Sequence, residues 1–242
     1  MNNSKIPGLL LWTYRLALLC LVMLPLAILC TRLNLVHFSI GLAVSALACI
    51  GAILIMFLSI TAWFLPKFKP FRASSQKTLL LTIAPVLIAL NAIASGGNYP
   101  AIHDVSTDTK NPPLFIEALN QRGSNSNSLE IVDKVLQSQL EAYPHLVPIS
   151  TSLSPMLAFQ KSLSIARNLG WDVYNTNIKT GVIEAVDTTL LYGFKDDIAI
   201  RILSQAGNTR VDLRSVSRVG VGDIGANAHR IETFINQFNN AQ

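Results

Sequence analysis

Acidic residues occupy only one end of this chain. All fourteen Asp and Glu residues lie between Asp104 and Glu232, whereas the first hundred residues carry seven basic residues and no acidic one. Long apolar runs without acidic residues are typical of membrane spans, whereas alternating polar and apolar residues are typical of a domain in water. The sequence therefore predicts a membrane region over residues 1–95 and a soluble domain over residues 100–242.

Three apolar runs in the first part have the composition of transmembrane helices, and we expect them to contact the lipid bilayer. Trp12, Tyr14 and Arg15 precede the first run and Arg32 follows it, as interfacial anchors do. A cleaved signal peptide would need an A-x-A-like site after this run, and the sequence has none there. The spans are predicted at about residues 16–31, 36–64 and 78–94.

The predicted spans lack the residues that build ion and proton pathways. Asp, Glu and Lys are absent from the depth of all three, so we interpret the helices as an anchor or a packing partner. Small residues at four-residue spacing let another helix approach closely, although such residues are also simply common in spans. A contact with a membrane-protein partner is therefore expected through Gly41, Ser45, Ala48 and Ala52.

Basic residues between the spans predict the orientation. The loop between the first two spans offers only Arg32 and His37, whereas the next loop carries four basic residues, and such loops face the cytoplasm. The amino terminus is then cytoplasmic and the soluble domain lies outside, which in a bacterium means the inner membrane and the periplasm. The four basic residues are Lys67, Lys69, Arg72 and Lys77.

The overall charge excludes some functions. The first hundred residues carry +7 and the rest carry −2, so the pI of about 9.2 comes from basic residues that flank the spans. This distribution predicts membrane orientation and no nucleic-acid partner. Cys20, Cys30 and Cys49 all lie in the apolar runs, which excludes a disulfide framework, a cysteine nucleophile and a cysteine zinc site from the soluble domain.

The soluble part shows three helical patterns. The first begins with Ser128 as its N-cap and ends before Pro144, the second runs from Ser154–Pro155 to Gly170, and the third from about Asp223 to Phe238. Their apolar stripes are Ile131, Val135, Leu136 and Leu140, then Phe159, Leu163 and Ala166, and finally Ile224, Ala228, Ile231, Ile235 and Phe238.

Between the second and third helical patterns the period changes to two. Residues 171–178, 181–191, 198–203 and 210–217 are predicted as four strands, with turns at 179–181, 195–197 and 207–208. Ile198, Ile200 and Ile202 are expected on one face with Val211 and Leu213, and Arg201, Asp212 and Arg214 on the other. The predicted fold is α+β, an antiparallel four-stranded meander with helices packed on one face.

Residues 220–225 match the dinucleotide fingerprint G-x-G-x-x-G after a predicted strand. That fingerprint also needs a second parallel strand after the helix, and the segment up to Gln242 holds only the helix. Asp223 would moreover put a negative charge among the amides that bind pyrophosphate. We therefore interpret the segment as a helix start with Asp223 near the N-cap, and predict neither a dinucleotide nor another cofactor.

Two sets of residues are candidates for a site. Arg214 and Arg218, leading to the N-terminus of the last helix, and Arg230 within it could hold an anion. The alternative is an ion ladder in which the arginines pair with Asp212, Asp223 and Glu184. His103, Asp104 and Asp108 share one loop and could be metal ligands or an acid–base pair, or ordinary turn formers. His145 and His229 have no partner in the sequence.

Residues spread over the whole soluble half resemble the domain of unknown function 1499 family. The strongest stretch is 211–220 followed by Asp223, Gly225, Asn227 and 230–231; other matching segments are 102–104, 107–108, 111–113, 169–171, 181–185, Thr188, 193–197 and Arg201. The resemblance implies a bacterial or plastid protein, often with an N-terminal membrane segment. It implies no reaction, because no activity is established for the family.

Two functional hypotheses follow from the sequence. The first is an inner-membrane protein whose outward domain is a non-catalytic module that binds a protein partner, a lipid headgroup or another anion. The second is a membrane-anchored hydrolase that uses His103 with Asp104 or Asp108. Convergence of these polar residues in a concave pocket would favour the enzyme.

Overall fold

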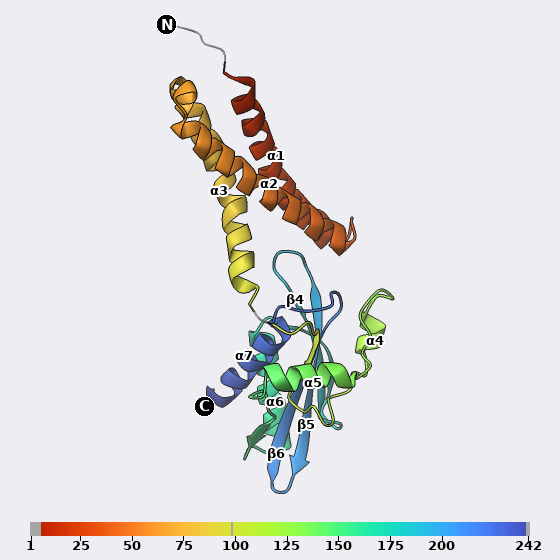
Figure 1. Cartoon of the computed structure of the whole chain (residues 1–242). Helices are drawn as coiled ribbons and strands as arrows, with labels where there is room; N and C mark the ends of the chain where they lie inside the picture. The colour runs from red at the N-terminus through yellow and green to blue at the C-terminus, as the bar shows by residue number, and fades with distance from the viewer. Residues whose placement is uncertain (1–5, 98, 241–242) are drawn as a thin grey trace. The chain divides into compact units, whose positions relative to one another are not determined.

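The computed structural model describes residues 6–97 and 99–240 of the chain (Figure 1). The chain forms two compact units. The helical unit comprises the residues up to 97 together with 190–193, and the soluble unit comprises the residues from 99 to 189 and from 194 onward.

The helical unit contains three helices that are long and apolar enough to cross a membrane, as predicted. They are α1 (Gly8–Arg32), α2 (Phe38–Phe64) and α3 (Arg72–Ser95), the last preceded by the 3₁₀ helix η1 (Pro66–Phe71). The first helix begins at Gly8, earlier than the expected position of about 16, because the apolar residues before Trp12 continue the helix back to Pro7.

The small residues of α2 lie inside the helical unit. Gly41, Ser45, Ala48 and Ala52 are all buried. Gly41 lies so close to α1 that an added Cβ would be 1.7 Å from Oγ1 of Thr31. The close helix approach that these residues predict therefore occurs within the chain, and binding of a separate membrane protein through them stays a prediction.

The soluble unit is built on an antiparallel sheet whose order is β1-β6-β5-β4-β3, with β2 also paired to β6. The predicted meander is confirmed as β3 (Asp172–Asn177), β4 (Val182–Thr188), β5 (Lys195–Gln205) and β6 (Asn208–Ser217). The sheet has six strands, not four, because β1 (Asp104–Ser106) and β2 (Ile149–Thr151) also pair with β6. Three residues are too few for an alternating pattern to be visible in a sequence.

One predicted turn is wrong. Residues 195–197 begin β5, and the loop that joins it to β4 spans residues 189–194. The two aspartates of this segment, Asp196 and Asp197, are buried and ion-paired within the fold. Adjacent acidic residues are typical of an exposed turn, so their burial cannot be predicted from the local pattern.

One face of the sheet carries the apolar core. Ile198, Ile200 and Ile202 are buried there with Val211 and Leu213, as the alternation predicts. They pack against α6 (Pro155–Asn168) and α7 (Ala226–Asn240), which lie together on this face (Figure 1). The predicted bounds of α6 are confirmed, since Ser154 caps its start by accepting from the amide of Leu157 and Gly170 follows its end with a φ of +79°.

Two helix starts differ from the prediction. α5 (Asp133–Ala142) begins after Val132, because the Ser128 hydroxyl accepts from the amide of Glu130 in a turn and caps no helix. In α7 the first turn begins at Ala226, and Ile224 lies before it, 63% exposed and with a positive φ. Phe234, which the predicted stripe omitted, is buried in the core and stacks on Trp171 at 5.7 Å.

A polar side chain of α5 completes the free edge of β1. Gln139, only 1% exposed, accepts from the amide of Ser106 at 2.9 Å and donates to its carbonyl at 2.5 Å. The amide group thus replaces a neighbouring strand, which satisfies the edge groups that would otherwise be buried without partners. This polar contact lies on the inner face of α5, and Val135 of the same helix packs against the apolar core.

We predict that Gly181→Ala destabilises the protein more than Gly207→Ala. Both glycines have a positive φ, +70° and +86°, so alanine costs about 1–2 kcal/mol at either position. Only at Gly181 would the new Cβ lie 2.2 Å from a backbone oxygen, that of Ile202, whereas Gly207 has open space around it. The added clash should cost about a further 1–3 kcal/mol. Thermal unfolding of the full chain in detergent measures both, and equal losses would contradict the packing argument.

Candidate functional site

The second face of the sheet is ionic and buried. The strand register places Glu184 beside Ala199 and Ala199 beside Arg214, and it pairs Arg201 with Asp212. These side chains lie on the face opposite the apolar core, because successive residues of a strand alternate. Residues 107–132, which include the short helix α4 (Ala118–Gln121), cover this face. Their backbone groups form hydrogen bonds with the buried side chains of Glu184 and Arg214.

The hydrogen-bond partners of the Arg214 side chain lie inside the domain. Its side chain is 1% exposed and forms a bidentate pair with Asp104, at 3.0 Å from Nε to Oδ1 and 2.7 Å from Nη2 to Oδ2. It also donates to the carbonyls of Pro113 and Leu129, and its guanidinium lies 5.3 Å from the ring centre of Phe115. Every nitrogen of the guanidinium therefore already has an acceptor.

Arg218 shares a buried carboxylate with a second arginine. It forms a bidentate pair with Asp197 at 2.9 and 2.7 Å, and Arg122 donates to the same carboxylate at 2.9 Å. Asp197 is fully buried, and burial also lowers the pKa of the Arg122 guanidinium, with Asp197 opposing that effect. Burial, aided by Asp197, raises the pKa of the Tyr174 phenol, which has no hydrogen-bond partner within the described residues.

Arg230 reaches the other end of the apolar face from α7. Its Nε donates to Asp187 at 2.9 Å, its Nη2 to Asp196 at 2.6 Å, and its Nη1 to Asn227 at 2.6 Å. The side chain is 7% exposed. Arg214, Arg218 and Arg230 thus have three separate sets of partners and do not converge on one anion site.

The expected ladder is wrong, because among the described residues Arg214, Arg218 and Arg230 pair with other acids than the three that were predicted. Of its three predicted acids only Asp212 pairs with arginines, namely Arg201 at 2.8 Å and Arg210 at 2.7 Å. Glu184, fully buried, instead accepts from backbone amides of residues 116–118, the shortest contact being 2.7 Å from Ile116, and so caps α4. These amides, together with the side chain of Asn175 at 2.6 Å, satisfy the carboxylate, and no arginine of the described residues pairs with it.

The candidate catalytic loop forms no acid–base pair. Nδ1 of His103 lies 3.3 Å from the carbonyl of Val221, while Asp104 pairs with Arg214. Asp108 accepts from two amides of its own turn and pairs with Arg201 and Arg210. Each residue is held by a structural partner, and the described residues contain no group of three or more His, Cys, Asp and Glu that fits a metal ion.

The glycine-rich segment 220–225 is a helix start. The carboxylate of Asp223 accepts from the amides of Gly225 at 2.9 Å and Asn227 at 2.8 Å, so it occupies the donors that a pyrophosphate would need. Burial raises the pKa of Asp223, and those two hydrogen bonds oppose the rise. Gly225 is required there because its φ is +77° and an added Cβ would lie 2.6 Å from the ring of Tyr99.

The pocket that best fits a functional site in the soluble unit lies between the end of α5 and the start of α7. It has a volume of about 460 Å³ and mixes aromatic, imidazole, carboxylate and apolar groups. We call it the histidine pocket. It is lined by Tyr99, Ala142, Tyr143, His145, Ile224, Gly225, Ala226, Ala228, His229 and Glu232.

The imidazole of His145 and the carboxylate of Glu232 are accessible in the histidine pocket, unlike the ion pairs of the ionic face. Nε2 of His145 contacts Oε1 of Glu232 at 2.5 Å, and these side chains are 58% and 38% exposed. The Tyr143 hydroxyl is buried without a hydrogen-bond partner among the described residues, and burial raises its pKa. Among the described residues that line the pocket there is no Ser, Cys, Lys or Asp, and its polar side chains are those of tyrosine, histidine and glutamate.

Sequence analysis missed this pocket. His145 and Glu232 are 87 residues apart, and neither belongs to a motif. The only local signal is the spacing of His229 and Glu232, three residues apart and therefore on the same side of α7. A loop residue after α5 cannot be linked to that helix face from the sequence alone.

Comparison with known families identifies the soluble unit. Residues 104–238 match the family model described as Protein of unknown function (DUF1499). No curated protein matches the chain. The match covers both the ionic face and all but Tyr99 of the histidine pocket.

We predict that Arg214→Met lowers the free energy of unfolding by about 3–5 kcal/mol, because it leaves Asp104 unpaired beneath the covering segment. The matched control is Arg210→Met. Its side chain is 27% exposed and both of its carboxylate partners keep Arg201, so the loss should stay under about 1 kcal/mol. The double variant Arg214→Met/Asp104→Leu should regain much of the loss in thermal melts. Similar melting of Arg214→Met and the unaltered protein would contradict the buried-pair argument.

Proposed function

This chain belongs to the DUF1499 family, and from that premise we propose that it is a membrane-anchored binding module whose soluble domain holds a ligand without reacting with it. The observation that carries the proposal is the contrast between the two polar regions of the domain. The arginines of the ionic face are paired with buried carboxylates, whereas the His145 and Glu232 side chains of the histidine pocket are exposed to solvent.

The contrast disfavours two other functions for the domain. An anion bound by Arg214, Arg218 or Arg230 would have to displace a carboxylate from a guanidinium whose nitrogens already have acceptors. A hydrolase based on His103 would need a neighbouring acid, but Asp104 and Asp108 are both held by arginines. Either function would require breaking contacts that stabilise the fold.

The chemistry of the histidine pocket favours a small, uncharged ligand with both hydrogen-bond donors and acceptors. Glu232 is an acceptor, the Tyr143 hydroxyl lacks a partner, and an imidazole can take either role. The described residues that line the pocket include no Arg or Lys to hold an anion, and the volume of about 460 Å³ suits a small molecule. A polyhydroxylated compound has this pattern of groups.

We predict that a photoreactive phenylalanine derivative placed at His229 captures a small molecule in living cells. Digestion of the recovered chain and mass spectrometry should show discrete adducts of small mass at this position. The same derivative at Leu203, 39% exposed on β5, is the matched control and should show none. Tyr143→Phe should weaken capture without lowering the melting temperature, because the deleted hydroxyl has no partner to lose.

Other adducts would overturn this assignment. Capture of phospholipid or of another protein at His229, or equal adducts at Leu203, would exclude the small-molecule site. Adducts whose mass corresponds to a cleaved form of the co-purified ligand would indicate turnover. The His145–Glu232 contact would then be a candidate general base.

The proposed orientation places this domain on the outer side of a bacterial inner membrane. We predict that alkaline phosphatase fused after Gln242 is active, because that enzyme matures only outside the cytoplasm. Replacing Lys67, Lys69, Arg72 and Lys77 by glutamine should reduce the activity, since these residues set the orientation. The same change at Lys110, Lys134 and Lys179, in the soluble domain, should not. An inactive fusion, with a cytoplasmic reporter active at the same site, would reverse the orientation.

A further inference from the structure

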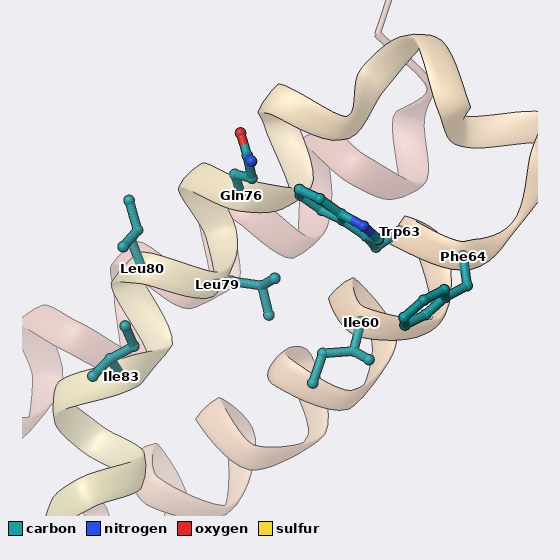
Figure 2. A pocket seen from close by; sticks show the side chains of 7 residues that line it. All are labelled: Ile60, Trp63, Phe64, Gln76, Leu79, Leu80 and Ile83. Atoms are coloured by element: carbon teal, nitrogen blue, oxygen red, sulfur yellow. The ribbon is translucent and has the colours of Figure 1, made fainter.

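The helical unit contains an apolar groove between the end of α2 and the start of α3. Its volume is about 490 Å³, and Figure 2 shows Ile60, Trp63 and Leu79 pointing into the space between the two helices. Six of the lining residues are large and apolar, and Gln76 is the polar exception. The lining residues are Ile60, Trp63, Phe64, Gln76, Leu79, Leu80 and Ile83.

One end of the groove is basic. Arg72, the first residue of α3, lies one helical turn before Gln76 and therefore on the same side of the helix. Its guanidinium lies 5.6 Å from the ring centre of Trp63, and its Nε donates to the Trp63 carbonyl at 3.3 Å. Lys69 in η1 and Lys77 beside Gln76 are exposed.

These cations have no carboxylate partner in their own unit. The sequence contains no Asp or Glu before Asp104, so none lies in or between the three helices. A positive cluster at a membrane interface attracts the phosphate of an anionic lipid, with each basic residue contributing about 1 kcal/mol. The helical unit of a second copy is disfavoured as the occupant, because it would bring only further positive charge.

We propose that this groove binds an anionic glycerophospholipid. The phosphate lies near Arg72 and the neighbouring lysines, and an acyl chain lies along Leu79, Leu80 and Ile83. Gln76 stands between the two regions, where its amide donates to the ester or glycerol oxygens. An aromatic residue at the interface, here Trp63, stays beside the headgroup and holds Arg72 through its ring and carbonyl. This site is independent of the histidine pocket and of the direction in which the chain crosses the membrane.

The test is native mass spectrometry of the full chain in detergent, with phosphatidylglycerol and phosphatidylcholine of identical acyl chains added in equal amounts. The chain should retain phosphatidylglycerol preferentially. Arg72→Gln should reduce that retention about fivefold, the factor that corresponds to about 1 kcal/mol per basic residue. Equal retention of both lipids by the unaltered chain would overturn the proposal.

Two controls separate a specific site from general attraction to charge. Arg15→Gln removes an exposed arginine that also stacks on a tryptophan, Trp12 at 5.4 Å, but it lies on α1 and does not line the groove. It should leave the preference unchanged, and a loss as large as that of Arg72→Gln would overturn the site. The exposed pair Lys69→Gln/Lys77→Gln should lower retention and, because no ion pair is lost, leave the melting temperature unchanged.

The apolar part of the groove is tested by filling it. Ile83→Trp should reduce phosphatidylglycerol retention several-fold, whereas Leu47→Trp, at a position 69% exposed on α2 outside the groove, should not. Glycerol phosphate, which has the charge but no acyl chain, should not compete with the lipid at equal concentration. Undiminished retention in Ile83→Trp, or competition by glycerol phosphate, would show that no acyl chain occupies this groove.

Discussion

The soluble domain depends on the burial of arginines beneath a segment that is mostly irregular. A guanidinium such as that of Arg214, 1% exposed, has lost its water and is stable only with a carboxylate and enough acceptors. The sheet supplies some carboxylates, but Asp104 comes from β1, and the carbonyls of Pro113 and Leu129 come from residues 107–132. The covering segment therefore has one arrangement because the arginines beneath it permit few others. We infer that these ion pairs contribute to the uniqueness of the fold more than to its net stability.

This constraint changes how the charged residues of the sequence are interpreted. Three arginines near the start of a helix suggest an anion site, and an aspartate-rich loop with a histidine suggests acid–base chemistry or a metal. In the fold these charged residues are held by partners inside the domain, as the pairs of Arg214 with Asp104 and of Asp108 with Arg201 illustrate. The residues open to a ligand are less conspicuous in the sequence. They come together only when the loop after α5 meets the exposed side of α7.

How well the sequence predicts an element depends on how far apart along the chain its interacting residues lie. The three apolar helices, the meander β3–β6 and helix α6 were predicted correctly, because each has a pattern of its own, such as Ser154 and Gly170 at the ends of α6. The strands β1 and β2 were not, because they are fixed by pairing with the distant strand β6. The start of α5 was not, because Ser128 accepts within a turn and caps no helix. The DUF1499 resemblance was confirmed, since it rests on residues throughout the domain. The histidine pocket was not predicted, because it joins residues 87 positions apart.

The uneven distribution of acidic residues has opposite consequences in the two units. In the soluble unit, arginines and carboxylates occur together, so the arginines that the sequence suggests as an anion site are neutralised by carboxylates inside the fold. In the helical unit the cations between α2 and α3 have no acid within reach along the chain, since the first is Asp104. Charge that the chain leaves uncompensated at a membrane interface attracts anions from its surroundings, and the commonest anion there is a lipid phosphate. The same residue type therefore serves as internal scaffold in one unit and as a contact with the membrane in the other.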